Sequence, residues 1–257
     1  MGIDNRKNKG EIKVLGIIPA RYGSTRLPGK PLADIAGKPM IQWVYERAVK
    51  AEKLDCVIVA TDDERILKTV ESFGGRAVMT SPHHPTGTDR LAEAADLYPE
   101  MDIIINIQGD EPLLNPATID AVASLLLADK NAVMSTACTR IGDPDLINSP
   151  TIVKVVLDRE MNALYFSRAP IPYFRRQTDM PVYRHIGLYG YRRDFLFTFT
   201  RLKPVPLEQT ESLEQLRALY YGYRIKTAVV EEDGLSVDTP EDLFRVREMI
   251  TVKGIDL

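Results

Sequence analysis

The segment from Asp102 to Pro112, DIIINIQGDEP, constrains the fold more than any other part of this 257-residue chain. Its apolar residues are consecutive and do not alternate with polar ones, which is typical of a strand buried on both faces of a parallel sheet. Parallel strands need long crossover connections, usually helices. One strand of this kind therefore predicts several others, with helices covering both faces of the sheet.

Short apolar runs and segments of helical period alternate through the first half of the chain. Strands are predicted at 14–20, 56–63, 77–80, 102–112 and 133–140. Helices are predicted at 40–51, 66–73, 88–98 and 117–127, with Thr88 as the N-cap of the third. This order predicts an α/β fold with a mostly parallel central sheet and right-handed crossovers.

The alternation of predicted strands and helices ends at about residue 150. Two strands joined by a turn are predicted within 151–168, followed by a proline-rich loop at 169–181, a helix at 211–221, a strand at 224–231 and a helix at 239–250. We interpret this half as an insertion at about 150–200 and a return to the main sheet. The expected organisation is a flexible extension at 1–12 and a single domain at 13–257.

Composition and charge exclude several classes of protein. The net charge of -3 argues against a nucleic-acid-binding protein, which is usually basic. The polar N-terminus lacks the apolar core of a signal peptide, and no apolar run is long enough to cross a membrane. Cys56 and Cys138 are predicted to be buried, reduced thiols, and there is no Cys/His cluster for zinc. A cytoplasmic protein without a membrane partner is expected.

A basic loop, ARYGSTRLPGK at 20–30, follows the first strand directly. Ligands of open parallel sheets bind outside the carboxyl ends of the strands. Arg21, Arg26 and Lys30 suit a triphosphate better than a single carboxylate, although the loop matches neither the Walker A nor the dinucleotide motif. A solvated basic surface loop is the alternative, but its place after a buried strand favours a phosphate site.

Acidic residues are predicted at the same edge of the sheet. Asp110 ends its strand, and a carboxylate beside a polyphosphate requires a cation between them, for which Mg²⁺ is the natural candidate. Asp238, in SVDTPEDL, is either a second ligand or the N-cap of the last helix, and the residues alone favour the cap. Asp62 and Asp63 are weaker candidates for a ligand, and Glu111 is expected to anchor its own turn.

A series of longer motifs occurs in one order along the chain: IPARYGSTRLPGKPL, VATDD, GTDRLAEA, INIQGDEP, VKVVLD, ALYFSRAPIP, RHIGLYGYR, LEQLRAL and VDTPEDL. From about Val14 to Met249 the chain resembles the CMP-Kdo synthetases, the 3-deoxy-manno-octulosonate cytidylyltransferases of lipopolysaccharide biosynthesis. The resemblance implies a Rossmann-like, GT-A-like nucleotidyltransferase fold, a three-layer sandwich whose inserted, smaller β-rich region serves dimerisation and sugar binding. It further implies a homodimer that uses Mg²⁺ to convert CTP and Kdo into CMP-Kdo and pyrophosphate.

The resemblance also implies roles for individual residues. Arg21, Ser24 and Lys30 would hold the triphosphate, together with Arg26 of the basic loop described above, and Arg90 would help to hold the nucleotide. Asp110 and Asp238 would be the metal ligands, which places the metal role of Asp238 above the cap. The sugar pocket would be lined by Gln108, Arg168, His185, Tyr189, Glu214 and Gln215.

Three of the assignments to the sugar pocket have a plainer alternative. Arg168 could form a structural ion pair, although a sugar carboxylate suits its planar, bidentate donor better. His185 could be an ordinary packed histidine, and Glu214 a solvated helix charge. His83 and His84 are interpreted as loop residues that shape the nucleotide site.

The implied reaction is attack of the sugar C2 hydroxyl on the α-phosphorus of CTP. No residue stands out as a general base, and a second Mg²⁺ is expected to lower the pKa of the sugar hydroxyl instead. An 8-amino analogue of Kdo and a sialic acid remain alternative substrates. A nucleotide-binding protein without catalysis is disfavoured because Arg21, Lys30, Asp110 and Asp238 are all present.

Overall fold

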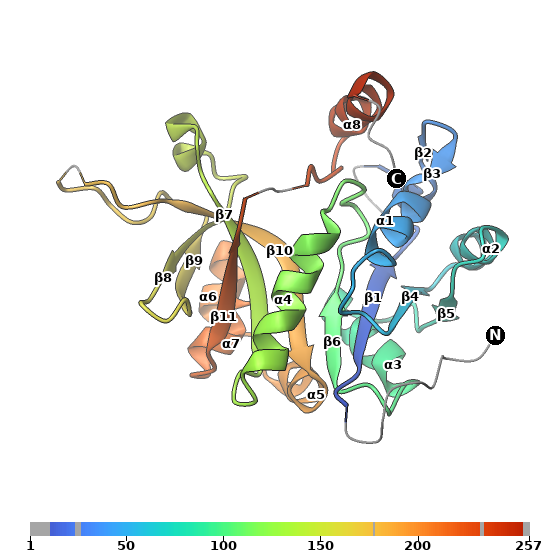
Figure 1. Ribbon diagram of the computed structural model, residues 1–257, viewed down its shortest axis with the longest axis horizontal. Helices are drawn as coiled ribbons and strands as arrows, with labels where there is room; N and C mark the ends of the chain where they lie inside the picture. The colour runs from blue at the N-terminus through green and yellow to red at the C-terminus, as the bar shows by residue number, and fades with distance from the viewer. Residues whose placement is uncertain (1–10, 24–26, 177, 232–233, 254–257) are drawn as a thin grey trace. The chain divides into compact units, whose positions relative to one another are not determined.

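The computed structural model describes residues 11–23, 27–176, 178–231 and 234–253. The chain divides into two compact units, one formed by 1–120 with 234–257 and the other by 121–233 (Figure 1). The second unit is longer than the insertion expected at 150–200, and a single domain over 13–257 stays a prediction. Most of the predicted extension, residues 1–10, lies outside the described residues.

The sheet of the first unit is parallel throughout its four strands. Their order is β6-β1-β4-β5, and the registers pair Leu15 with both Cys56 and Ile104. The central strand is buried along nearly its whole length, as expected for a strand covered on both faces. The strands are β1 (Val14–Ala20), β4 (Cys56–Thr61), β5 (Ala77–Met79) and β6 (Ile103–Asn106).

The helices of the first unit follow from this strand order. The chain steps outwards from β1 through β4 to β5, and then returns past β1 to β6. Because crossovers between parallel strands are right-handed, the outward and returning helices cover opposite faces. The outward helices are α1 (Met40–Ala48) and α2 (Glu64–Ser72), and the returning helix is α3 (Gly87–Asp96).

The last segment of the chain returns to the first unit. There α8 (Pro240–Lys253) belongs to a cluster in which buried Val237, Val246 and Ile250 accompany Ile35, Met40 and Trp43. Trp43 Nε1 donates a hydrogen bond to Ile35 O (2.9 Å). This cluster adjoins η1 (Lys30–Leu32) and the small hairpin of β2 (Asp34–Ile35) and β3 (Lys38–Pro39), which the sequence analysis did not predict.

Two predictions for the first unit are wrong in detail. The strand expected at 102–112 ends at Asn106, because the chain turns at Gln108–Glu111 to bring Asp110 to the sheet edge. Helix α3 begins at Gly87, so its N-cap is Thr86 and not Thr88. The Thr86 hydroxyl accepts a hydrogen bond from Asp89 N (3.2 Å), whereas Thr88 is buried inside the helix.

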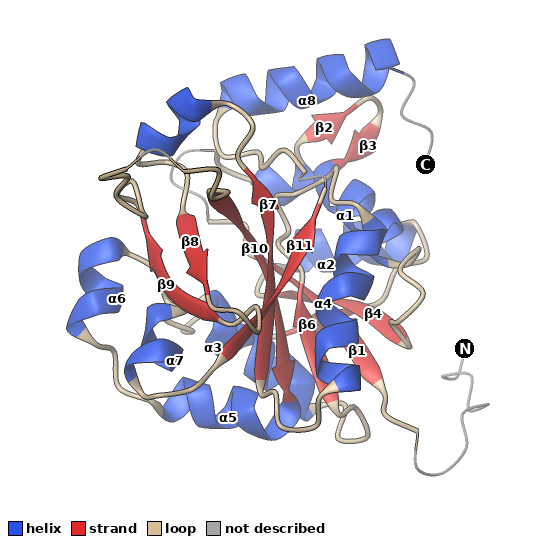
Figure 2. Cartoon of the chain, turned by 60° about the vertical axis from the view of Figure 1, so that its left-hand side comes forward, coloured by secondary structure: helices blue, strands red, loops and turns tan. Residues whose placement is uncertain are grey.

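The second unit begins within α4 (Pro116–Ala128) and contains a mixed sheet (Figure 2). β11 is parallel to β7, while β10 is antiparallel to β7 and β8, and β8 to β9. The strands are β7 (Met134–Arg140), β8 (Lys154–Leu157), β9 (Ala163–Ser167), β10 (Tyr183–Arg192) and β11 (Ile225–Val230). The remaining elements are η2 (Pro144–Asn148), α5 (Arg193–Arg201), α6 (Pro206–Glu211) and α7 (Leu216–Tyr220).

The helix predicted at 211–221 is observed only as the short α7 at 216–220, and α6 ends where the predicted helix begins, at Glu211. Ser212 ends α6 with a left-handed backbone (φ 53°), which no residue inside an α-helix adopts. The break places Glu214 and Gln215 in a turn. Among the described residues, no helix combines the length and the apolar character that a membrane span requires.

Candidate active site

A pocket of about 480 Å³ lies at the carboxyl ends of β1 and β6 in the first unit. These adjacent strands lead into connections on opposite faces of the sheet, and such a switch point is where open α/β sheets bind ligands. The pocket contains six of the residues predicted for the site: Arg21, Lys30, Arg90, Gln108, Asp110 and Asp238. Ser24 and Arg26 lie outside the described residues.

Lys30 joins the two aspartates. Its Nζ donates to Asp110 Oδ2 (2.7 Å), to Asp238 Oδ1 (3.1 Å) and to the backbone carbonyl of Val237 (3.0 Å). Val237 N in turn donates to Asp110 O (2.8 Å), which ties the turn after β6 to the segment before α8. Two carboxylates 128 positions apart in sequence therefore meet at one cation.

The structure removes the alternative cap role of Asp238. Helix α8 starts at Pro240, so Thr239 is the residue before its first turn. The Thr239 hydroxyl accepts from Asp242 N (3.2 Å), and the Asp242 carboxylate accepts from the N–H of Thr239 (3.0 Å). Because these two residues cap the helix reciprocally, Asp238 does not serve as the cap, and its carboxylate lines the pocket.

The aspartate pair fits a magnesium ion that is shared with a substrate. Mg²⁺ is usually held by one or two carboxylates together with substrate phosphates and waters. No group of three or more His, Cys, Asp or Glu side chains that could hold a metal occurs in the described part of the chain. Any Mg²⁺ held by Asp110 and Asp238 would therefore need further oxygen ligands from water and nucleotide.

The basic loop is held in a turn beside the pocket. Gly29 N donates to Tyr22 O (3.1 Å), and Gly29 has the positive φ (69°) that glycine adopts without strain. The guanidinium of Arg65 lies over the Tyr22 ring, 3.4 Å from its centroid. Arg21, at the start of the turn, is exposed in the pocket wall, where it can meet an anion.

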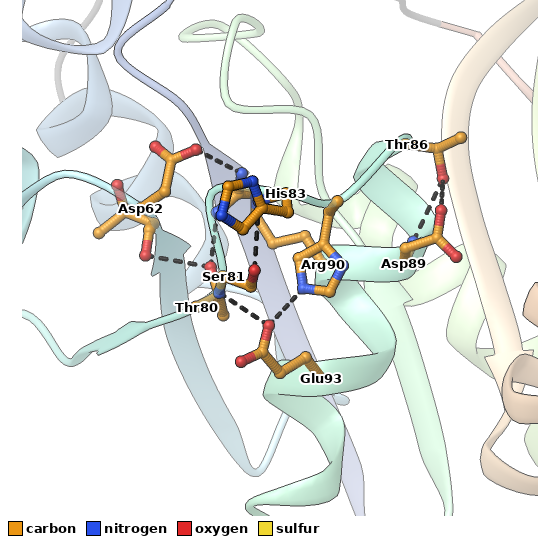
Figure 3. Close-up of polar contacts among 10 residues, drawn as sticks. Asp62, Thr80, Ser81, His83, Thr86, Asp89, Arg90 and Glu93 are labelled. Carbon is orange, nitrogen blue, oxygen red and sulfur yellow. Dashed lines mark hydrogen bonds and ion pairs between the residues drawn. The ribbon is translucent and has the colours of Figure 1, made fainter.

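Arg90 is committed to a buried ion pair (Figure 3). Its Nη2 donates to Asp62 Oδ2 (2.6 Å) and its Nη1 to Thr80 Oγ1 (2.5 Å), with only 5% of the residue exposed. Asp62, a weaker candidate for a metal ligand, is thus the partner of Arg90. Asp63 is the N-cap of α2 and accepts from Arg65, whose side chain lowers the pKa of this carboxyl.

His84, predicted only to be a loop residue that shapes the nucleotide site, has a defined partner in the structure. His84 Nε2 forms a short contact with Glu93 Oε2. The same oxygen accepts from Ser81 N (2.9 Å) (Figure 3). Burial raises the pKa of Glu93, but the hydrogen bonds from His84 and Ser81 outweigh it and leave the pKa lowered. His84 lines the pocket, whereas His83 is exposed.

We expect Gly109→Ala to lower the free energy of unfolding by about 1–3 kcal/mol, because overpacking forces the backbone to shift. A Cβ at Gly109 would lie 2.9 Å from the backbone oxygen of Pro19, in the pocket wall. Urea unfolding followed by circular dichroism measures the change. The matched control is Gly23→Ala, where a Cβ meets nothing within 4 Å; equal midpoints for the two variants would contradict the prediction.

The remaining predicted residues lie in the second unit, and Arg168 follows β9 directly. Its Nε donates to Glu211 O (2.8 Å) and its Nη1 to Pro150 O (3.1 Å), while the Glu211 carboxylate accepts from Arg168 N (2.9 Å). Within the described part of the chain, the guanidinium is therefore oriented by carbonyl oxygens and not by an ion pair. Three of its five N–H donors have no acceptor among the described residues and could serve a carboxylate ligand.

His185 and Tyr189 lie on β10, with ring centroids 5.4 Å apart, and the His185 ring also meets the edge of Phe166 on β9 (4.8 Å). His185 Nε2 is 2.9 Å from Thr136 Oγ1. The same hydroxyl lies within hydrogen-bonding distance of Leu188 O (2.8 Å), so the Thr136 side chain joins His185 to the backbone of its own strand. Burial lowers the pKa of His185 to about 3, so the ring is neutral at physiological pH.

This neutral histidine predicts a pH dependence of stability. The unfolded chain protonates His185 below about pH 6.5, but the folded chain does not. The free energy of unfolding therefore decreases as the pH falls below that value. At pH 5 the loss approaches about 2 kcal/mol, and His185→Gln should remove it. Urea unfolding at pH 7 and pH 5 measures the difference. The exposed His83→Gln should keep the wild-type decline, and an unchanged decline in His185→Gln would refute the assignment.

Glu214 and Gln215 occupy the turn between α6 and α7. Gln215 is only 4% exposed, and its Nε2 has no hydrogen-bond partner in the described structure, as expected of a donor that awaits a ligand. Glu214 Oε1 lies 3.8 Å from Arg217 Nη2. Arg217 itself forms a buried, bidentate pair with Glu208, its Nε 2.7 Å from Glu208 Oε2.

Comparison with known proteins identifies the family. Residues 15–226 match the family model described as cytidylyltransferase. The 3-deoxy-manno-octulosonate cytidylyltransferase of Geobacter metallireducens is 51% identical over 251 residues, which cover 93% of this chain and 98% of the relative. That of Solibacter usitatus is 52% identical over 238 residues, with 92% and 94% covered. The chain belongs to the 3-deoxy-manno-octulosonate cytidylyltransferase family.

Solved structures agree with this family. The structure of CMP:2-keto-3-deoxy-manno-octonic acid synthetase complexed with CTP has a TM-score of 0.91 and 46% identity, covering 94% of this chain and 99% of that chain. A cytidylyltransferase from Leptospira borgpetersenii, 20% identical with a TM-score of 0.62, shares the fold over 94% of this chain and 88% of its own. These similarities confirm the predicted α/β nucleotidyltransferase fold of this family member.

Three features of the site were missed by the sequence analysis: the pairing of Lys30 with both aspartates, the Asp62–Arg90 pair, and the His84–Glu93 contact. A signal existed for the third, since His84 and Glu93 flank the N-terminus of a predicted helix. The other two join charges from separate βα connections, which sequence spacing does not reveal.

Proposed function

We propose that this protein transfers the cytidylyl group of CTP to Kdo with Mg²⁺, giving CMP-Kdo and pyrophosphate for lipopolysaccharide biosynthesis. The observation that carries the proposal is the meeting of Asp110, Asp238 and Lys30 in one pocket at the sheet switch point. Two carboxylates and a cationic turn form a site for a metal–triphosphate complex. The curated relatives named above are 3-deoxy-manno-octulosonate cytidylyltransferases, and one solved relative was complexed with CTP.

The chain's own groups contribute mainly by position and charge. Phosphoryl transfers of this kind depend on alignment and on neutralising charge at the leaving group. Arg21, and Lys30 once it is free of the aspartates, would neutralise the departing pyrophosphate. Asp110 and Asp238 would hold Mg²⁺, which when bound supplies charge neutralisation at the phosphates and lowers the pKa of the attacking hydroxyl.

The sugar is proposed to bind through residues of the second unit. Arg168 has free donors for its carboxylate, and Gln215 offers a buried, unpaired Nε2. His185, Tyr189 and Glu214 would contribute further contacts to the sugar. Gln108, which is also proposed to contact the sugar, lines the pocket of the first unit. A neutral His185 can act as a hydrogen-bonding and packing group, and its low pKa does not suit a general base at pH 7.

A cytoplasmic homodimer belongs to the same proposal. The family resemblance implies the dimer, and both cysteines are buried free thiols, as in a reducing compartment. Burial raises the pKa of Cys138 to about 12, which keeps it protonated. Light scattering on the purified protein tests the dimer, and a monomer at micromolar concentration would overturn it.

The test of the reaction is pyrophosphate release with each nucleoside triphosphate in combination with Kdo, its 8-amino analogue and a sialic acid. We expect turnover with CTP and Kdo, and product of the mass of CMP-Kdo. Preference for the amino sugar or the sialic acid would replace Kdo in the proposal. Release without any sugar acid, or with ATP alone, would reject the proposal as a whole.

A further inference from the structure

All three N–H donors of the Lys30 ammonium group are used in hydrogen bonds at the proposed metal site. An ammonium group has three N–H donors and no acceptor. The three acceptors within reach are Asp110 Oδ2 at 2.7 Å, Val237 O at 3.0 Å and Asp238 Oδ1 at 3.1 Å. With its side chain only 15% exposed, Lys30 has no donor left for a phosphate in this arrangement.

The ammonium and a divalent ion are competitors for the same oxygens. Mg²⁺ binds carboxylate oxygen at about 2.1 Å. With Nζ already within 3.1 Å of both carboxylates, an ion ligated by Asp110 and Asp238 would face a positive charge at close range. Repulsion at that distance is large in a partly desolvated pocket, so the two cations cannot share the pair.

We infer that Lys30 is an exchangeable occupant of the metal site: it neutralises Asp110 and Asp238 without metal, and the divalent ion displaces it towards the phosphates. The inference rests on the proposed metal role of the two aspartates. It assigns Lys30 two successive sets of partners within one pocket. Metal binding and phosphate binding are thereby coupled through a single side chain.

The exchange has two consequences for the free protein. Metal alone must displace the ammonium, so affinity for metal is low until phosphates are present to receive Lys30. The carboxylates, in turn, never face each other without a counter-ion. The protein therefore favours metal that arrives together with nucleotide over metal that arrives alone.

Manganese binding to the full chain without nucleotide tests this exchange, measured by electron paramagnetic resonance. We expect Lys30→Met to bind Mn²⁺ about tenfold more tightly than the wild type, because the competing ammonium is gone. The matched control is Lys38→Met, which removes an ammonium paired at 2.8 Å with the carboxylate of Glu46 outside the pocket. Its Mn²⁺ affinity should equal that of the wild type.

Thermal unfolding gives a second readout that needs no activity. Lys30→Met leaves the two carboxylates unneutralised, so in EDTA its Tm should be lower than that of the wild type. Addition of Mn²⁺ should raise the Tm of the variant by more than it raises the Tm of the wild type. Lys30→Gln, which keeps hydrogen-bonding groups without charge, should behave in the same way and guards against a folding defect of the methionine variant.

The outcomes separate this inference from the proposed function. Equal Mn²⁺ affinity in wild type and Lys30→Met, including binding too weak to measure in both, would overturn the exchange. Asp110→Asn introduced into Lys30→Met should abolish the gained affinity. If Mn²⁺ binding survives that double change, the aspartates are not the metal ligands, and the metal site of the proposed function fails with the exchange.

Discussion

Asp110→Asn is expected to lower kcat for cytidylyl transfer by about a thousandfold or more while CTP still binds. The variant keeps the volume of the side chain but removes half of the carboxylate pair proposed to hold Mg²⁺, and metal charge neutralisation contributes several kcal/mol to such reactions. The cations Arg21 and Lys30 remain to bind the triphosphate. Pyrophosphate release over a wide range of Mg²⁺ and Mn²⁺ concentrations, with calorimetry for CTP, measures both effects.

The control for this prediction is Asp34→Asn, because Asp34 is an exposed aspartate of the same unit outside the pocket wall. It loses the same charge and should retain wild-type turnover. Wild-type activity in Asp110→Asn at any metal concentration would remove Asp110 from the proposed metal site. Loss of CTP binding in that variant would instead show that Asp110 contributes to the affinity for the nucleotide.

Arg217→Met is expected to destabilise the protein by about 3–5 kcal/mol, because it leaves the buried Glu208 carboxylate without its partner. Arg217 is 6% exposed and Glu208 9%, and the pair joins α6 to α7. The Arg217 guanidinium also lies 5.1 Å from the centroid of the Phe199 ring. Urea unfolding followed by circular dichroism at pH 7 measures the loss.

The double variant Glu208→Gln/Arg217→Met is the control for burial of an unpaired charge. It should recover a large part of the loss, since the buried Glu208 side chain no longer carries a charge. A loss below about 1 kcal/mol in the single variant, or equal losses in the single and double variants, would show that the ion pair does not hold these helices together.

Much of the fold could be predicted from hydrophobic patterning. The first strand is observed at its predicted bounds, Val14–Ala20, because most of its residues are apolar and buried, as in a strand covered on both faces. The strand predicted at 102–112 was too long, since apolar runs do not show where a chain turns away from its sheet. The predicted helix at 211–221 failed for a backbone reason, the left-handed Ser212, which side-chain periodicity does not report.

The candidate site was predictable where it follows from strand ends. The rule that parallel strands bring their carboxyl ends together was enough to place Lys30 and Asp110 in one pocket. Asp238 needed the family resemblance, because its sequence context equally suits a helix cap. The burial of Arg90 against Asp62 depends on how two connections pack, which one sequence does not reveal.

The route of the chain has a consequence for how the enzyme is made. Asp110 and Asp238 belong to one compact unit, yet all of residues 121–233 are synthesised between them. A ribosome releases the chain from its N-terminus onwards, and domains generally fold as they emerge. The early strands can assemble at once, but the aspartate pair is completed only after the second unit has left the ribosome. Chains that stop short of Asp238 would therefore lack half of the proposed metal site.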